Sequence, residues 1–185
     1  MATTDIGIDL GTANTVITLG RKGVVLREPS AIAYHLRTKE VLAVGMAAYE
    51  MIGKTPDYIT VVRPLSNGVI SDDRMAQYMI REFILRVTGK RLLKPRIIIC
   101  VPSFITDVEK RAFFELFYKS KFRPKNVMLC EKPLADAVGL GIDVNQPTGV
   151  MVVDMGADTI EISVISLGGL VLSDLMHFGS NRLDE

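Results

Sequence analysis

Short runs of apolar residues, separated by turn-forming residues, dominate the start of the chain. Apolar positions within residues 5–33 fall into three segments, with turns at Gly11 and at residues 20–23 between them. This pattern predicts three short strands joined by tight turns. The pattern is less regular over residues 34–67, where one short amphipathic helix is expected near Ala47–Ile52. We therefore interpret this stretch as a small inserted subdomain.

Helical and strand signals alternate through the middle of the chain. Asp72 precedes apolar residues at helical spacing and is expected to cap a helix that ends near Val87. The continuous apolar run Ile97–Val101 predicts a strand buried on both faces. Thr106 and Glu109 form a capping-box signature, which indicates that another helix starts there.

The last third of the chain repeats the layout of its start. A strand at Val127–Cys130 and a helix at Leu134–Gly139, opened by Pro133, come first. Residues 149–175 then follow the same strand–loop–strand–turn–strand pattern as residues 5–33, and the repeat is incomplete.

Together these elements predict an α/β fold with a mixed sheet and flanking helices. We expect a first domain at residues 1–33 and 68–145, with the inserted subdomain at residues 34–67. Residues 146–185 are expected to be the start of a second, truncated domain.

Two turns of the same chemistry lie far apart in the chain. One runs from Asp9 to Thr15 and the other from Asp154 to Thr159, and each lies between two apolar, β-prone runs. Both are therefore expected to be strand–turn–strand hairpins. Glycine allows a ligand to approach the backbone closely, and successive N–H groups in such turns form concave anion sites.

The pairing suggests two hairpins that hold the phosphates of a nucleotide between them. The candidate phosphate-binding residues are Gly11, Thr12, Ala13 and Asn14 in the first turn and Gly156, Ala157, Asp158 and Thr159 in the second. Asp9 and Asp154, one at each strand end, are candidates to hold a hydrated Mg²⁺.

Composition narrows the function classes. Apolar residues make up 48% of the 185 residues, and the net charge is +1, from 22 basic and 21 acidic residues. A balanced charge argues against a nucleic-acid partner. Cys100 and Cys130 are expected to be buried thiols of a cytoplasmic protein rather than a disulfide. The sequence shows no secretory signal and no apolar stretch of membrane-spanning length, although peripheral membrane contact stays open.

Several motifs, in order and with ordinary spacing, resemble the bacterial actin family that determines rod shape, MreB and its close paralogues. They are Ile8–Thr15, Arg27–Ser30, Gly68–Asp72, Cys100–Ser103, Glu131–Pro133 and Val152–Gly156. Chaperones of the 70-kDa heat-shock class share the first turn but lack the Arg-Glu-Pro-Ser segment, so they fit less well.

The resemblance implies an actin-like, ribonuclease H-like fold whose two halves enclose ATP and Mg²⁺. It also implies self-assembly into filaments at the inner face of the cell membrane, where they guide cell-wall synthesis and elongation proteins. The two turns match the phosphate-binding turns of the family, and Asp9 and Asp154 match its acidic residues near the metal. The adenine-binding residues of the family lie mostly in a second half that these 185 residues do not contain.

Three departures from the family pattern argue against ATP turnover by this polypeptide. Asp158 and Ile160 replace a glycine and a threonine of the second turn, and a carboxylate there repels phosphate. Lys132 stands before Pro133, where the family has an acidic residue that positions the hydrolytic water, and a charged lysine accepts no proton. The third departure is the end of the chain at residue 185.

These departures leave three alternatives to a nucleotide-binding filament protein. The first is a working ATPase, which would need the second half supplied elsewhere and Glu131 in the acidic role, through a register slip of one residue. The second is a degenerate, non-hydrolysing interaction module. A heat-shock-class ATPase is the third possibility.

Lys132 and Asp158 suggest a compensating change. We expect the two to face each other across the cleft, either as an ion pair that neutralises both charges or as two solvated side chains pointing apart.

Leu92 and Leu93 form an apolar pair between basic residues, in a loop after the first long helix. Such a pair suits shallow insertion into an anionic membrane surface. Leucines that cap the helix against the core would produce the same pattern.

Overall fold

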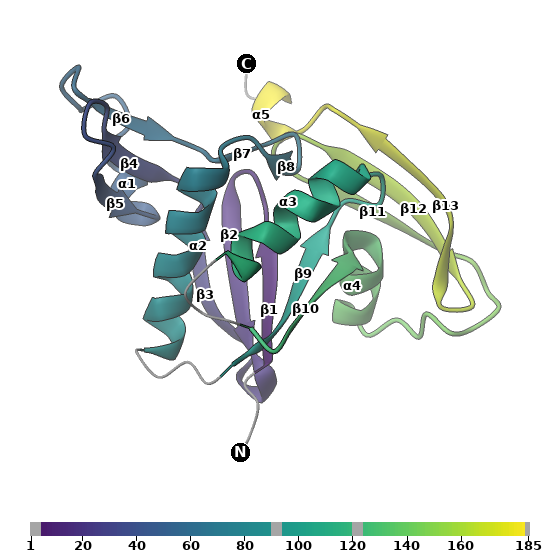
Figure 1. Ribbon diagram of the computed structural model, residues 1–185. Coiled ribbons are helices and arrows are strands. Elements are labelled where there is room, and N and C mark those ends of the chain that lie inside the picture. The colour runs from purple at the N-terminus through teal and green to yellow at the C-terminus, as the bar shows by residue number, and fades with distance from the viewer. Residues whose placement is uncertain (1–4, 90–93, 120–123, 184–185) are drawn as a thin grey trace.

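Five strands form the main sheet of the protein, seen in a computed structural model that describes residues 5–89, 94–119 and 124–183 (Figure 1). The strands are β1 (Asp5–Leu10), β2 (Asn14–Leu19), β3 (Val24–Pro29), β9 (Arg96–Val101) and β10 (Asn126–Glu131), in the order β10-β9-β1-β2-β3. β10, β9 and β1 are parallel, while β2 and β3 continue the sheet antiparallel, joined by a short 3₁₀ turn at Gly20–Lys22. The predicted mixed sheet is confirmed.

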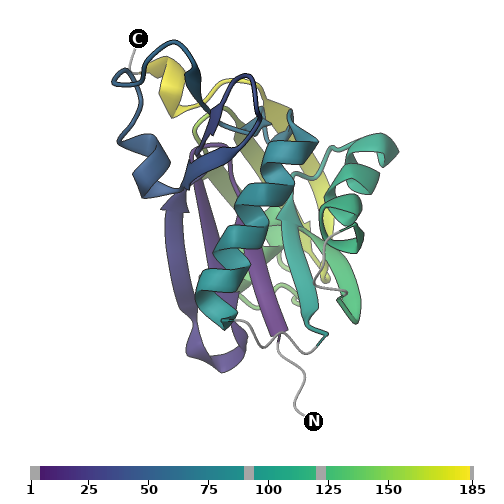
Figure 2. The same ribbon diagram turned by 60° about the vertical axis from the view of Figure 1, so that its left-hand side comes forward.

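Two helices, α2 (Asp73–Thr88) and α3 (Asp107–Tyr118), cover one face of this sheet (Figure 2). Their apolar sides carry Phe83, Phe113 and Phe117, which are fully buried against the alternate apolar residues of β1 and β9. Both helices begin as expected. Asp72 accepts a hydrogen bond from the Met75 N–H at 3.0 Å, and Thr106 and Glu109 form the complete capping box.

The prediction that the strand at Ile97–Val101 is buried on both faces is wrong. Ile97 and Ile99 face the helices and are buried, but Ile98 is 44% exposed. Its neighbour in register on β10, Met128, is also exposed. An unbroken apolar run gives no information about which faces are covered, because the covering helices come from elsewhere in the chain.

Residues after β3 form a second, smaller sheet. It has the order β5-β4-β6, from β4 (Ile32–His35), β5 (Val41–Val44) and β6 (Ile59–Val62). Helix α1 (Met46–Tyr49) packs on it through the buried Ala48 and is shorter than predicted, because the chain passes into turns that end at Gly53, where φ is 71°. A two-stranded hairpin, β7 (Leu65–Ser66) and β8 (Val69–Ile70), then leads into α2. The domain boundaries stay predictions.

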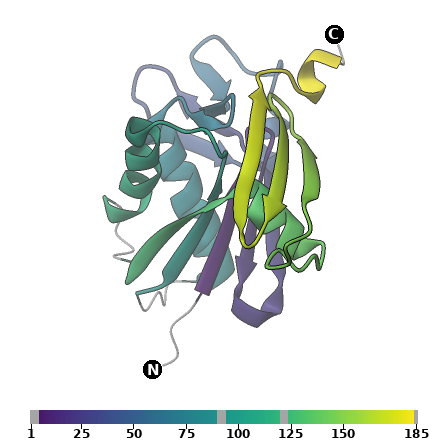
Figure 3. The same ribbon diagram turned by 90° about the vertical axis from the view of Figure 1, so that its right-hand side faces the viewer.

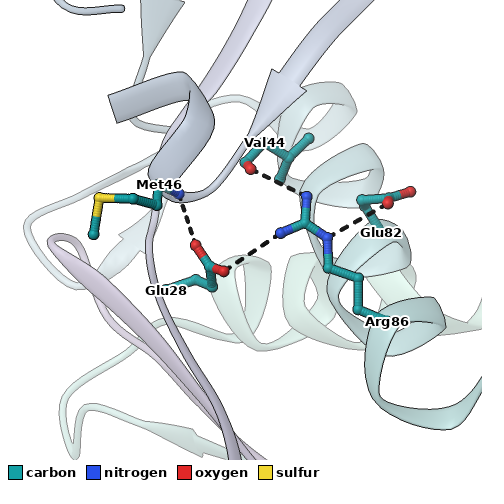
Figure 4. A network of polar contacts seen from close by, with 5 residues as sticks. All are labelled: Glu28, Val44, Met46, Glu82 and Arg86. Carbon is teal, nitrogen blue, oxygen red and sulfur yellow. Dashed lines mark hydrogen bonds and ion pairs between the residues drawn. The ribbon is translucent and has the colours of Figure 1, made fainter. Parts of the chain in front are cut away.

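A polar network around Arg86 ties this small sheet to the rest of the fold (Figure 4). Glu28, at the end of β3, accepts a hydrogen bond from the Met46 N–H at 2.7 Å and another from Arg86 at 3.4 Å. Arg86 also donates to the Val44 carbonyl at 3.2 Å and pairs with Glu82 on its own helix. The network gives the acidic residue of the Arg-Glu-Pro-Ser segment a structural role.

The predicted repeat appears as a third sheet, β11-β12-β13, with β11 (Val150–Met155), β12 (Ile160–Ser166) and β13 (Gly169–Met176), followed by α5 (Ser180–Leu183). Helix α4 (Lys132–Gly139), which has Pro133 in its first turn, lies between this sheet and the main one. Ala137 of α4 is buried with Val152 and Ile165 of the third sheet. No helix of the described residues lies in front of the outer face of that sheet (Figure 3). Among the described residues, no helix is both long and apolar enough to cross a membrane.

Candidate functional site

The two predicted turns meet at one cavity of about 290 Å³, between the ends of β1 and β11. It is lined by all eight candidate phosphate-binding residues: Gly11, Thr12, Ala13, Asn14, Gly156, Ala157, Asp158 and Thr159. Asp9, Asp154 and Lys132 line it as well. Glu131 is exposed and is not among the lining residues. Leu92 and Leu93 lie outside the described residues.

One backbone hydrogen bond closes the first turn, and two hydrogen bonds from Ser30 support it. The Gly11 N–H donates to the Asn14 carbonyl at 3.1 Å, and a Cβ at Gly11 would lie only 2.8 Å from that same oxygen. Ser30 is fully buried, and its hydroxyl donates to the Gly11 carbonyl at 2.6 Å while its N–H donates to the Ala13 carbonyl at 2.9 Å. The serine of the Arg-Glu-Pro-Ser segment therefore fixes the shape of this turn.

A backbone hydrogen bond of the same kind closes the second turn, but a different segment supports this turn. The Gly156 N–H donates to the Thr159 carbonyl at 2.8 Å. The start of α5 lies against it: Ser180 donates its N–H to the Gly156 carbonyl, and Asn181 donates to that of Ala157. A Cβ at Gly179 would overlap the Ala157 backbone, so only glycine allows this approach. Sequence reasoning missed residues 179–181, because their role exists only through this contact.

Free backbone donors remain in both turns. Within the described residues, the N–H groups of Thr12, Ala13, Ala157 and Asp158 donate to no protein acceptor. All four residues line the cavity. Unbonded N–H groups around a concave surface favour an anion, because each lacks the acceptor that a buried donor needs.

The β7–β8 hairpin connects the two turns at the cavity. Its Gly68 N–H donates to the Thr12 hydroxyl at 3.4 Å, and the neighbouring Asn67 N–H donates to the Asp158 carboxylate at 3.0 Å. The other Asp158 oxygen accepts from the Asn181 side chain at 2.8 Å. Asp158 therefore directs its charge to two N–H donors, which reduces the repulsion that a carboxylate on this turn would otherwise exert on a phosphate.

The predicted ion pair between Lys132 and Asp158 is wrong, and so is the alternative of two solvated side chains. The Lys132 ammonium lies 2.7 Å from Asp154 Oδ2, and each side chain is 23% exposed. Asp154 shares a face of β11 with Val152, and that face packs against α4, the helix that carries Lys132. Strand alternation therefore turns Asp154 toward the lysine.

Lys132 and Asp9 influence each other electrostatically. Burial lowers the pKa of Lys132, but the charge of Asp9 and the hydrogen bond to Asp154 outweigh it, so the pKa is raised and the ammonium stays charged. Burial raises the pKa of Asp9, the nearby Asp154 raises it further, and Lys132 opposes both.

Two further titratable side chains line the cavity, Glu161 and Cys100, and Asp136 lies on the neighbouring helix α4. Glu161 is 2% exposed and accepts hydrogen bonds from the Ser103 N–H at 3.1 Å and the Ser173 hydroxyl at 3.2 Å. Burial raises the pKa of Asp136, on α4, to about 6, and its buried Oδ2 has no hydrogen-bond partner in the described structure. Burial also raises the pKa of the Cys100 thiol to about 12, and both Cys100 and Cys130 are free thiols.

The hydrated Mg²⁺ between Asp9 and Asp154 stays a prediction. The ammonium of Lys132 engages Asp154 Oδ2, whereas Asp154 Oδ1 and the Asp9 carboxylate have no hydrogen-bond partner within the described residues, and Mg²⁺ beside phosphates needs only one or two carboxylates. The described part of the chain contains no cluster of three or more His, Cys, Asp or Glu side chains suited to a metal. The cavity is a candidate anion site because of the unbonded N–H groups of its two turns, and Lys132 is the one basic side chain among its described lining residues.

Solved structures with a similar fold define the class of protein. The fold matches MreB5 of Spiroplasma citri bound to AMPPNP with a TM-score of 0.91 and 32% identity, covering 100% of this chain and 55% of that one. It also matches MamK in a double helical filament, with a TM-score of 0.79 and 21% identity, covering 99% of this chain and 57% of that one. The fold is actin-like, as the sequence predicts.

Sequence comparison gives the family. The family model described as MreB/Mbl protein matches residues 3–185. The chain is 45% identical over 181 residues to the cell shape-determining protein Mbl of Bacillus subtilis, covering 97% of this chain and 54% of that protein. It is 42% identical over 191 residues to the cell shape-determining protein MreB of Escherichia coli, covering 100% of this chain and 54% of that protein. The chain belongs to the MreB/Mbl family and spans about half the length of these relatives.

Proposed function

We propose that this chain belongs to a bacterial actin-like cytoskeletal protein that binds ATP or ADP by its phosphates between the two turns. The observation that carries the proposal is the shared cavity, where four unbonded N–H groups from Thr12, Ala13, Ala157 and Asp158 meet. Related structures support an adenine nucleotide as the ligand, since MreB5 of Spiroplasma citri has been solved with AMPPNP and with ADP.

Calorimetric titration of the 185-residue chain with AMPPNP and ADP, in Mg²⁺ and in EDTA, tests this binding. Ala13→Glu and Ala157→Glu each place a carboxylate at a lining position, and each is expected to weaken binding by about tenfold or more through charge repulsion. Ala47→Glu, on the exposed side of α1, is the matched control and should leave the affinity unchanged. Equal affinities for all four proteins would refute binding between the turns.

We further propose that the bound nucleotide is not hydrolysed by this chain. Lys132 occupies the position where an acidic residue would orient water, and Glu131 is exposed, away from the cavity-lining residues. Phosphate release should stay at the background rate in both the unaltered chain and Glu131→Gln. Release that Glu131→Gln abolishes would instead favour a working ATPase.

In the cell, we propose filaments at the inner face of the membrane that guide cell-wall synthesis and elongation proteins. The family membership and the filament formed by MamK support self-assembly. The membrane contact at Leu92 and Leu93 rests on the sequence alone. Pelleting with anionic liposomes tests it, since the double variant Leu92→Ser and Leu93→Ser should bind less, and unchanged binding would remove this loop from the proposal.

A further inference from the structure

The turn between β2 and β3 carries exposed basic and apolar side chains together. It contains the 3₁₀ turn Gly20–Lys22 and is closed by a hydrogen bond from the Leu19 N–H to the Gly23 carbonyl at 3.1 Å. Val24 and Val25 follow, and they are 58% and 37% exposed. Alternation along a strand would normally place two consecutive side chains on opposite faces. Here β3 has one residue more than β2, and this bulge accompanies the exposure of both valines.

Basic residues gather at the same end of the main sheet (Figures 1 and 2). β1, β3, β9 and β10 begin at this end and β2 finishes there, as their parallel and antiparallel pairing requires. The exposed basic residues at these strand ends are Arg21, Lys22, Lys94, Arg96 and Lys125. Among the described residues of these strand ends, Asp5 is the one acidic residue, and both of its carboxylate oxygens accept from Arg96 at 2.7 Å. The remaining basic side chains have no ion-pair partner within the described residues.

This combination of charge and apolar surface suits an anionic lipid surface. The excess of positive charge is local, because the net charge of the whole chain is only +1. Unpaired basic side chains attract anionic headgroups, and exposed valines can enter the boundary between headgroups and acyl chains. The valines favour lipid over other polyanions, since a lipid surface offers both anionic groups and an apolar layer. The cavity lies at the opposite end of β1, so this contact would orient it away from the lipid.

We propose that the β2–β3 turn, residues 20–25, is a second membrane contact. Its two basic residues bind anionic headgroups, and Val24 and Val25 insert at shallow depth. This inference rests on the proposed membrane association and adds to it a contact that is separate from Leu92 and Leu93.

The test measures pelleting of the 185-residue chain with vesicles of phosphatidylglycerol and phosphatidylcholine. The unaltered chain should bind more tightly as the share of phosphatidylglycerol rises, because that lipid is anionic. The double variant Arg21→Glu and Lys22→Glu should weaken binding by about tenfold or more, since it reverses the charge of the turn. The double variant Val24→Ser and Val25→Ser keeps the charge and should weaken binding by about threefold or more.

The matched control reverses two exposed basic residues that lie outside this end of the sheet. Arg37, between β4 and β5, and Lys54, between α1 and β6, belong to the turns of the small sheet. The double variant Arg37→Glu and Lys54→Glu should bind nearly as tightly as the unaltered chain, because charges farther than about 10 Å from the lipid are largely screened.

Each outcome separates the turn from the wider membrane proposal. Weaker binding of both turn variants, with the control unchanged, supports the inference. Turn variants that bind like the unaltered chain overturn it, and the contact at Leu92 and Leu93 then stands alone. An equal loss in the control overturns it as well, because overall charge then explains the effect. Absence of binding to anionic vesicles by the unaltered chain refutes the membrane association and the inference together.

A second measurement uses the unaltered chain only, and so does not depend on a variant folding. Lipids with a nitroxide at the headgroup broaden the amide signals of residues close to them. When the isotopically labelled chain binds anionic bicelles that contain such lipids, the Gly20 and Gly23 signals should broaden. The Gly53 signal, from the turn before β6, should stay sharp. Sharp Gly20 and Gly23 signals in the bound chain would overturn the inference.

Discussion

At the scale of single residues, two unusual charges in the cavity are compensated by different partners. Asp158 is held by N–H donors from the β7–β8 hairpin and from Asn181, and Lys132 is held by Asp154. Buried charges are tolerated when each has a partner. Both departures from the family pattern therefore fit a folded site with an open cavity.

Asp136 is the exception, because its buried Oδ2 has no partner. Burial, with the charge of Asp154, raises its pKa from 3.8 to about 6, so the folded chain favours the protonated form. The stability that this group contributes is present below about pH 4 and is lost as pH rises through about pH 6.

Asp136→Asn is therefore expected to be more stable than the unaltered chain at neutral pH and equally stable below about pH 4. The pKa shift of Asp136 corresponds to about 3 kcal/mol in the free energy of unfolding. Solvent screening of this half-buried group reduces the expected gain in the free energy of unfolding of Asp136→Asn to about 1 kcal/mol. Urea denaturation of both proteins at about pH 3.5 and about pH 8 measures this gain. If the difference in the free energy of unfolding between Asp136→Asn and the unaltered chain is the same at both pH values, the raised pKa of Asp136 is contradicted.

At the scale of elements, each turn depends on a segment that is distant in sequence. Ser30, after β3, supports the first turn, and residues 179–181, at the start of α5, support the second. Both segments donate hydrogen bonds to turn carbonyls, and within the described residues the N–H groups of Thr12, Ala13, Ala157 and Asp158 have no protein acceptor. The supports are therefore expected to affect the site by shaping the turns, and Ser180 also lines the cavity.

Gly179→Ala tests the second support. Its Cβ would overlap the Ala157 backbone, so either α5 or the turn must shift, and ADP affinity is expected to fall about tenfold or more. Gly139→Ala is the matched control, because a Cβ at Gly139 meets open space. Calorimetry on both variants gives the comparison. Equal affinity in the two would show that α5 does not shape the site.

Local signals allowed much of the fold to be predicted from the sequence. The caps at Asp72 and Thr106 depend on residues three positions apart, and both turns depend on glycine within a short segment. The exposure of Ile98, the pairing of Lys132 with Asp154 and the approach of Gly179 could not be predicted. Each of these depends on how separate elements pack, and no spacing in the sequence encodes it.

At the scale of the whole molecule, the third sheet is covered on one side only. Val152 faces α4 and is buried, while Met151 and Leu172 point to the other side, where each is 67% exposed. The two share a face, because both pair in register with Val164. An exposed apolar sheet face of this kind favours association between molecules.

We therefore expect the 185-residue chain to self-associate as its concentration rises. The double variant Met151→Lys and Leu172→Lys should shift sedimentation toward the monomer by charging this face. Val24→Lys with Val108→Lys, which charges two exposed apolar residues elsewhere, should not. Monomeric behaviour of the unaltered chain at all concentrations would contradict the expectation.

The most direct test follows the backbone amides of both turns while a nucleotide is added. The isotopically labelled chain is titrated with AMPPNP, and each amide chemical shift is recorded. If the two turns hold the phosphates between them, residues 11–14 and 156–159 should shift together and saturate at one dissociation constant. Shifts confined to a single turn, or to a surface away from this cavity, would show that the nucleotide is not held between the turns.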